Sequence, residues 1–197
     1  DDGGGDPGTD PDATGDPDAA GDPDGVEDGA DGIDGEDADG GDGSTVARPW
    51  VMGYYVGYQR DLYPPADVRY DALTHLAVGR VAPEADGSLD TTFDIDPVSG
   101  PAMADDLTTR AHAAGIATIL MVGGAGEHDG FAASCSSAGT RATLVANLVS
   151  FSAAHGFDGL DLDWEPLPPE DHADFRALAE DLRVAWPGVI LTIPVGY

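Results

Sequence analysis

The sequence contains no lysine, and its eight basic residues, all arginines, stand against 38 acidic residues and give a formal net charge of −30. Nucleic acids and anionic lipid surfaces are bound mainly through lysine and arginine, so this balance argues against both kinds of partner. No stretch approaches the roughly 18–20 apolar residues that cross a bilayer, so we expect no transmembrane segment. Neutral and cationic ligands remain compatible with the charge.

Cysteine is almost absent as well, since Cys135 is the only one in the chain. A disulfide within the chain needs two cysteines, and a four-thiolate metal site needs four. Both are therefore excluded, and the redox compartment stays open.

The acidic residues are concentrated at the start of the chain. Seventeen of them, and no basic residue, lie within residues 1–44, in short Asp-Pro-Asp and Asp-Gly units. Such a segment has too few apolar side chains to offset its ordering entropy, so we predict a disordered acidic linker over residues 1–48. The alternative is calcium binding by carboxylates separated by glycines, although the full pattern of a calcium hand is not met. The candidate ligands are Asp22, Asp24, Asp28, Asp31 and Asp34.

From Trp50 onward, apolar runs of strand length alternate with longer stretches that end at glycine or proline, as buried strands and helices do. The predicted strands are Trp50–Tyr58, Thr74–Val81, Ile116–Gly123, Gly159–Glu165 and Val189–Val195. The predicted helices are Pro101–Ala114, Thr140–His155 and Glu170–Ala185, with a shorter one at Asp67–Ala72. This alternation predicts a parallel β/α fold, which is either a doubly wound sheet or an eightfold barrel. An eightfold barrel takes about 250 residues, so five strands would be its first half plus one strand.

Three carboxylates are spaced two residues apart in the fourth predicted strand. Successive strand side chains point to opposite faces, so Asp161, Asp163 and Glu165 share one face, while the apolar residues between them share the other. If the apolar side chains meet the helices, the carboxylates point into the interior of a barrel, where an unpaired charge is costly.

Crowded carboxylates cannot all ionise freely, so at least one of them should have a raised pKa and be able to act as a general acid. Glu165 is the best candidate, because it lies at the C-terminal end of its strand, where barrel enzymes place their active sites. Asp163 can share a proton with either neighbour. Asp158 lies off this face and is expected to fix the start of the strand by binding backbone amides. The alternative is a magnesium or calcium site made by the same carboxylates.

Residues 158–165, Asp-Gly-Leu-Asp-Leu-Asp-Trp-Glu, resemble the D-G-x-D-x-D-W-E signature of glycoside hydrolase family 18, the chitinases and related endo-N-acetylglucosaminidases. Three further segments are similar to the first, second and third strand motifs of that family. They are Gly53-Tyr54-Tyr55, Thr74-His75-Leu76 and Gly123-Gly124. The resemblance implies that residues 49–197 form the N-terminal portion of a (β/α)8 TIM barrel, truncated after strand five, and we expect the natural polypeptide to continue.

By this resemblance, the reaction is hydrolysis of a β-1,4 bond beside an N-acetylglucosamine unit in chitin or a related glycan. The substrate's own acetamido oxygen attacks the anomeric carbon, and the configuration is retained. Glu165 would serve as general acid and then general base, Asp163 would orient the acetamido group, and Asp161 would hold the proton that Asp163 releases. The candidate substrate-binding residues are Tyr54, Gly123 and Gly124. No cofactor and no metal are implied.

The sequence departs from the family pattern at three places. Met121 stands where the family usually has a serine of the aspartate network, and Arg80 stands where an aromatic residue is common. Arg80 either pairs with an aspartate or lies at the rim in solvent, and we favour the rim. The strand-six tyrosine and strand-eight tryptophan of the family would lie beyond Tyr197, so we expect this chain alone to be inactive.

Two rival functions remain. One is a glycan-binding barrel that has lost turnover, which the departures at Met121 and Arg80 make conceivable. The other is a metal-dependent barrel enzyme that uses the same carboxylates. An enzyme that degrades a polymer meets its substrate outside the cell, so we expect a secreted or surface-anchored protein, monomeric at full length.

Overall fold

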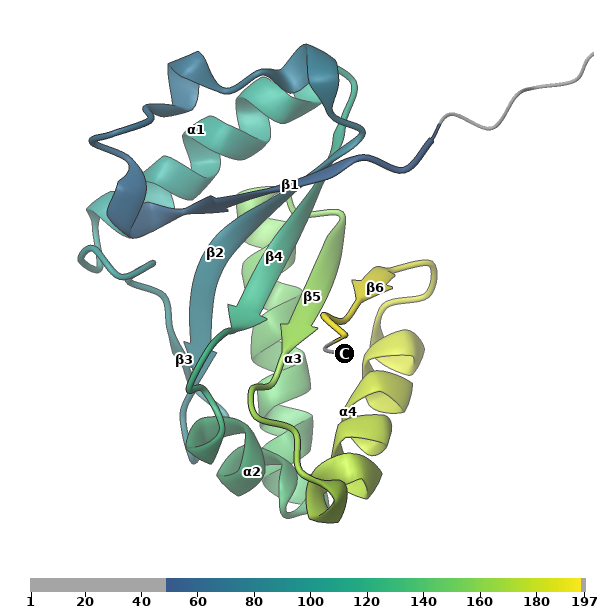
Figure 1. Cartoon of the computed structure of the whole chain (residues 1–197). Coiled ribbons are helices and arrows are strands. Elements are labelled where there is room, and N and C mark those ends of the chain that lie inside the picture. The colour runs from purple at the N-terminus through teal and green to yellow at the C-terminus, as the bar shows by residue number, and fades with distance from the viewer. Residues whose placement is uncertain (1–48, 196–197) are drawn as a thin grey trace, which may run out of the picture. The chain divides into compact units, whose positions relative to one another are not determined.

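Five parallel strands form the centre of the structure, a computed structural model that describes residues 49–195 (Figure 1). In sheet order they are β1 (Met52–Val56), β2 (His75–Pro83), β4 (Ala117–Gly123), β5 (Gly159–Asp163) and β6 (Ile190–Thr192). A two-residue strand, β3 (Leu89–Asp90), pairs with the end of β2 in the antiparallel direction. The acidic segment 1–48, with the predicted linker and the candidate calcium ligands, lies outside the described residues.

Helices connect the parallel strands. They are α1 (Ser99–Ala113), α2 (Asp129–Cys135), α3 (Ala138–His155) and α4 (His172–Ala185). In the view of Figure 1, α3 lies behind the sheet and α4 lies beside β6. Gly156 ends α3 at a positive φ of 73°, and Gly115 follows α1 at 72°, as their terminator positions in the sequence predict. Among residues 49–195, no helix is long and apolar enough to cross a membrane.

The main core lies between one face of the sheet and these helices. Its fully buried side chains include Leu76, Leu107, Leu120, Leu144, Leu148, Leu160, Leu162, Leu178 and Leu182. Burial of apolar surface contributes roughly 25 cal/mol per Å², so this layer supplies most of the driving force for folding. Leu144 and Leu148, four residues apart in α3, place one face of this helix in the core.

The opposite face of the sheet is concave. The hydroxyl of Tyr54 in β1 donates a hydrogen bond to the carboxylate of Asp161 in β5 over 2.8 Å, although β2 and β4 lie between these strands. In a flat sheet, strands three positions apart would be separated by about 14 Å, too far for these two side chains to meet. The sheet therefore curls, and the chain forms an incomplete (β/α)8 barrel, as predicted.

Several element boundaries differ from the prediction. The predicted strand 50–58 is paired only over Met52–Val56, and the predicted strand 189–195 only over Ile190–Thr192. The predicted helix 67–72 is wrong, because two separate 3-10 turns, Pro65–Asp67 and Tyr70–Ala72, occupy this stretch. The hydroxyl of Tyr70 donates to the carbonyl of Pro65 over 2.9 Å and ties the two turns together without a continuous helix. Two elements, β3 and α2, have no counterpart in the prediction.

Candidate active site

The acidic residues of β5 lie on the concave face of the sheet. Asp161 is fully buried and Asp163 is 7% exposed, while Leu160 and Leu162 enter the core on the other side. Trp164 also turns to the helix side, where its ring stacks on that of Phe131 in α2, with a centroid distance of 5.0 Å. The alternation predicted for residues 160–165 is therefore confirmed.

Asp161 is held through both of its carboxylate oxygens. Oδ2 accepts the hydrogen bond from Tyr54, and Oδ1 accepts one from the hydroxyl of Thr192 in β6 over 2.5 Å. Burial and the Asp161 carboxylate raise the pKa of Tyr54 far above its usual value, so this phenol stays protonated at every physiological pH. Sequence reasoning missed Thr192, because this contact depends on the register of β5 with β6, in which Asp161 pairs with Thr192.

Asp163 has the most strongly perturbed carboxyl group of this trio. Its buried Oδ1 has no hydrogen-bond partner among the described residues. Burial, the adjoining carboxyl of Glu165 and the charge of Asp161 together raise the pKa of Asp163 to about 7, against the opposing charge of Arg80. Near neutral pH, the Asp163 carboxyl is therefore partly protonated beside the carboxyl of Glu165, and we call these two residues the acid pair.

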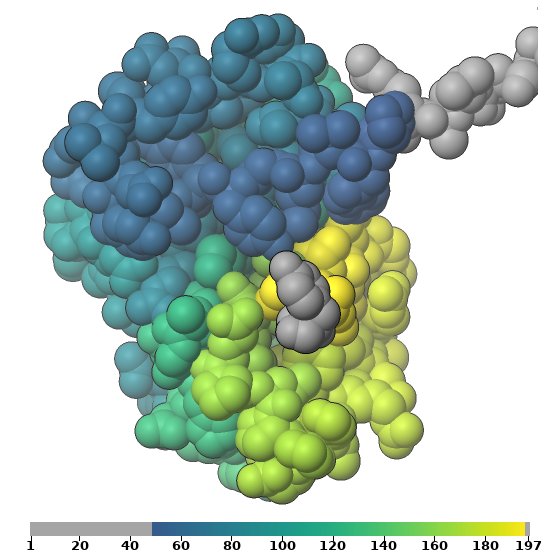
Figure 2. Space-filling model, viewed as in Figure 1, coloured from purple at the N-terminus to yellow at the C-terminus, as the bar shows by residue number. Residues whose placement is uncertain are grey.

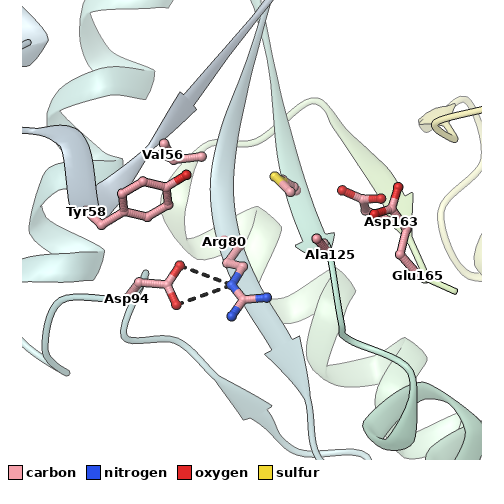
Figure 3. Close-up of a pocket in the computed structure, with 9 residues that line it drawn as sticks. Val56, Tyr58, Arg80, Asp94, Ala125, Asp163 and Glu165 are labelled. Atoms are coloured by element: carbon pink, nitrogen blue, oxygen red, sulfur yellow. Dashed lines mark hydrogen bonds and ion pairs between the residues drawn. The ribbon is translucent and has the colours of Figure 1, made fainter.

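The acid pair faces an open pocket of about 590 Å³ (Figure 3). Glu165 lies two residues beyond the last residue of β5. The predicted face of Glu165 is therefore correct, but the predicted strand is two residues too long. The polar residues that line the pocket are Tyr58, Arg80, Asp94, Asp163 and Glu165. A sugar unit needs both hydrogen-bonding groups and apolar surface, and the ring of Tyr58, 62% exposed, supplies the latter.

Two glycines bring the end of β4 close to the end of β5. Gly123 adopts a φ of +92°, and a Cβ atom there would collide with the carbonyl oxygen of Asp163 and the ring of Phe131. The amide of Gly124 donates to the same carbonyl over 2.7 Å. Only Gly124 lines the pocket, whereas Gly123 packs against the backbone behind it. Both glycines thus position Asp163, a role that the sequence prediction of substrate binding did not include.

Asp158 lies away from the pocket, as predicted. Its Oδ2 accepts hydrogen bonds from the backbone amide and the hydroxyl of Thr118 in β4, over 2.8 and 3.1 Å, and lies 2.9 Å from Nε2 of His112. Although burial opposes the effect, these donors hold the pKa of Asp158 below its usual value. Asp158 therefore fixes the start of β5 against β4, and only one of its donors is a backbone amide.

Arg80 differs from the preferred prediction, which placed it in solvent. Its side chain is 26% exposed at the pocket and pairs with Asp94 at 3.0 Å and with Glu127 at 2.9 Å. The other prediction, a pair with an aspartate, is confirmed, but the partner lies outside the signature. Sequence reasoning missed Asp94, which lies 14 residues from Arg80 in a segment without a motif.

Met121 lines the pocket where a serine was expected to support the aspartates. Thr192 provides a hydroxyl to Asp161 from the other neighbouring strand, so this acid is not left without its second donor. Of the tyrosines near β1, Tyr55 is 6% exposed and belongs to the core. Across residues 49–195, no three histidine, cysteine, aspartate or glutamate side chains are arranged to hold a metal ion.

A family model described as glycosyl hydrolases family 18 matches residues 51–195. A chitinase-like effector of Moniliophthora perniciosa is 30% identical over 125 residues, which cover 64% of this chain and 28% of that protein. Chitinase 1 of Aphanocladium album is 30% identical over 118 residues, which cover 52% of this chain and 28% of the other.

Solved structures share the fold. The family 18 chitinase of Cycas revoluta in complex with (GlcNAc)3 superposes with a TM-score of 0.64 at 26% identity, covering 75% of this chain and 46% of that one. A Group IV chitinase of Ostrinia furnacalis in complex with allosamidin has a TM-score of 0.65 at 21% identity, with coverage of 74% and 43%. The chain thus spans less than half of these structures and under a third of the curated relatives it matches.

Proposed function

Because the chain belongs to family 18 of the glycosyl hydrolases, we propose that its acid pair serves the hydrolysis of β-1,4 bonds beside N-acetylglucosamine units, in chitin or a related glycan. The observation that carries the proposal is that Asp163 and Glu165 face one open pocket, with a raised pKa at Asp163, above a third carboxylate, Asp161, that is fixed by two donors. A carboxyl group with a pKa near neutral lets this site hold a proton at the start of the reaction and take one back later.

In the proposed reaction, Glu165 donates its proton to the glycosidic oxygen while the bond from that oxygen to the anomeric carbon breaks. The acetamido oxygen of the substrate forms the new bond to this carbon and gives a cyclic oxazolinium ion. Asp163 orients the acetamido group and stabilises the positive charge. Glu165, now a carboxylate, removes a proton from water as the water attacks the anomeric carbon and the bond from that carbon to the acetamido oxygen breaks. The two successive inversions leave the configuration retained.

Asp161 is proposed to take the proton that Asp163 releases. Both Asp161 oxygens accept hydrogen bonds in this structure, so one hydroxyl, of Tyr54 or of Thr192, must turn from donor to acceptor when the proton arrives. Either rotation needs only a change in the O–H direction, because a hydroxyl can donate and accept.

The substitution Glu165→Gln tests the proposal. It removes the proton donor with little change in shape, so we expect turnover of a chromogenic N-acetylglucosamine oligomer to fall about 10²–10⁴-fold. The assay uses the longest natural polypeptide that contains this chain, because we propose that the chain alone, which covers less than half of the solved relatives, is inactive. Glu170→Gln, an exposed acid in the following turn, is the matched control. Turnover unchanged by Glu165→Gln would exclude the proposed acid.

A glycan-binding barrel without turnover is the second candidate. Met121, which brings a thioether into the pocket wall in place of a hydroxyl, favours it. Binding to chitin with no oligosaccharide released, in the same longer polypeptide, would support this candidate over hydrolysis. In either case we propose a protein that meets its glycan outside the cell and acts as a monomer.

A further inference from the structure

Arg80 in β2 connects two loops at the pocket. Within the described part of the chain, the other arginines that form ion pairs each have one carboxylate partner, whereas Arg80 pairs with Asp94 and Glu127. The exposed fractions of these three side chains are 26%, 33% and 28%. Partial burial reduces screening by water, so the pairs are stronger than those on an open surface.

Asp94, the partner of Arg80 in the segment between β3 and α1, is held in an unusual backbone conformation. Phe93 and Asp94 have φ angles of 54° and 56°, in the left-handed region that residues other than glycine rarely adopt. The side chain of Phe93 is completely buried in the core, which fixes this backbone. Strained residues that the surrounding structure holds in place are typical of functional sites. Here the result is an aspartate whose Oδ1 and Oδ2 both accept from Nε of Arg80, over 3.2 and 3.0 Å.

Glu127, the second partner of Arg80, fixes the loop between β4 and α2. The amide of Glu127 donates to the carbonyl of Gly124 over 2.9 Å, and Gly124 lines the pocket. A Cβ atom on Gly124 would lie 3.6 Å from Nη1 of Arg80, so this backbone packs directly on the guanidinium. In Figure 3, Arg80 lies between Asp94 on one side and the acid pair on the other.

We infer that Arg80 is a positioning residue for the acid pair, because with Asp94 and Glu127 it fixes one side of the pocket and presents a positive charge to the Asp163 carboxyl. This inference rests on the proposed function for the role of the acid pair, but the arrangement itself does not depend on turnover. By the resemblance described above, family 18 commonly has an aromatic side chain at the position of Arg80. The role inferred for Arg80 is therefore not taken from the family.

The charges around Asp163 make the inference testable. Glu165 from the same segment and Asp161 from the same strand raise the pKa of Asp163, and Tyr54 from β1 is a phenol whose own pKa is raised. The nearest pocket residue from β4 is the uncharged Met121. Arg80 supplies the opposing positive charge and lowers the pKa of Asp163. Its own charge is partly offset by the two carboxylates that it binds.

Removal of Arg80 and removal of one of its partners should therefore act in opposite directions. In Arg80→Met the pKa of Asp163 should rise by about half a unit or more, because the opposing charge is lost. In Glu127→Gln it should fall, because a negative charge is lost and Arg80 is less neutralised. Both substitutions break the same ion pair, so damage to the loop alone would move the pKa in the same direction in both variants.

The measurement is a carboxyl 13C NMR titration of the 197-residue chain, with the Asp163 signal identified by its loss in Asp163→Asn. Arg69→Met is the matched control, since Arg69 pairs with an exposed aspartate, Asp71, and does not line the pocket. Opposite shifts in the two test variants, with none in the control, are the expected result. An unchanged titration in Arg80→Met, or shifts of the same sign, would overturn the inference.

Two further points distinguish failure of this inference from misfolding of a variant and from failure of the proposed function. If Arg80→Met does not give a folded amide spectrum, Glu127→Gln alone decides, and an upward or absent shift there overturns the inference. The titration needs no substrate, so it stands even if the longer polypeptide releases no oligosaccharide. If that polypeptide is active, the alkaline limb of its pH profile should move upward in Arg80→Met and downward in Glu127→Gln.

Discussion

Asp163 carries a carboxyl group that folding forces into an unfavourable environment. One of its oxygens is buried without a partner in the described residues, and its pKa is raised to about 7 from the ordinary value of 3.8. The folded state therefore favours the neutral form of the Asp163 carboxyl. The contribution of this neutral carboxyl to the free energy of unfolding is fully present below pH 3.8 and is lost as the pH rises through about 7.

The substitution Asp163→Asn should remove this dependence. Relative to the unsubstituted chain, the variant should gain stability between pH 4 and pH 8, by an amount on the order of a few kcal/mol. Urea unfolding at several pH values measures the difference. Asp61→Asn, at an 87% exposed carboxyl, is the control and should show no such trend. A constant difference between Asp163→Asn and the unsubstituted chain across this range would contradict the raised pKa.

At the level of single residues, the sequence predicted what depends on local spacing. The shared face of Asp161, Asp163 and Glu165 follows from strand alternation alone, and the structure confirms it. The partners of these acids were not predictable, since Thr192 meets Asp161 only through the register of two strands 31 residues apart. The catalytic roles assigned to the three acids remain a prediction.

Among the elements, the end of β4 determines where β5 ends. Gly123 pairs with Asp163 as the last step of the ladder between these strands, and its positive φ turns the chain away. The predicted strand extended to Glu165 because the alternating pattern continues past the point where backbone pairing stops. The short helix α2 was missed because glycines precede and begin it, and because seven residues are too few for a clear helical period.

The substitution Gly123→Ala tests this close approach of β4 and β5. The new methyl group would collide with the Asp163 carbonyl and the Phe131 ring, so we expect a loss of about 2–4 kcal/mol in the free energy of unfolding. Gly126→Ala is the matched control in the following loop. Its φ of +87° is also left-handed, but a Cβ there meets nothing within 4 Å, so it should cost only about 1–2 kcal/mol. Equal losses in the two variants, measured by urea unfolding, would contradict the proposed contact.

For the whole molecule, the alternation of strand and helix was enough to predict a parallel β/α fold, and the resemblance chose an incomplete barrel over a doubly wound sheet. The degree of curvature was not predictable, because it depends on contacts between distant strands such as β1 and β5. The division into an acidic linker at residues 1–48 and a barrel portion at 49–197 remains a prediction, and its first part lies outside the described residues.

The two donors of Asp161 join β1 and β6 to β5 across the curved sheet, and Thr192→Val tests this connection. Loss of the hydroxyl leaves one oxygen of a fully buried carboxylate without a donor, which should cost about 1–3 kcal/mol of unfolding free energy. Thr192→Ser keeps the hydroxyl and should restore most of it. If Thr192→Ser, which keeps the hydroxyl, were destabilised in urea as much as Thr192→Val, the hydrogen bond to Asp161 would not account for the loss.

The space-filling view shows the dark-blue start of the described chain and its yellow end on the same face of the molecule, near the light-green residues around β5 (Figure 2). This face is where the carboxylates gather, and their surroundings there come from strands at both ends of the fold. On the opposite side of the sheet, the residues that follow β5 pack against the short helix α2.

Trp164 stands between the two members of the acid pair in the sequence, and its ring lies flat against Phe131 of α2. The segment that carries the reactive groups is therefore braced from behind by a short helix that contributes no polar atom to the pocket. A change of packing within α2 would therefore tilt this aromatic brace and shift Glu165 with it. Under the proposed function, substitution of apolar side chains in α2 would alter turnover without any contact with the glycan.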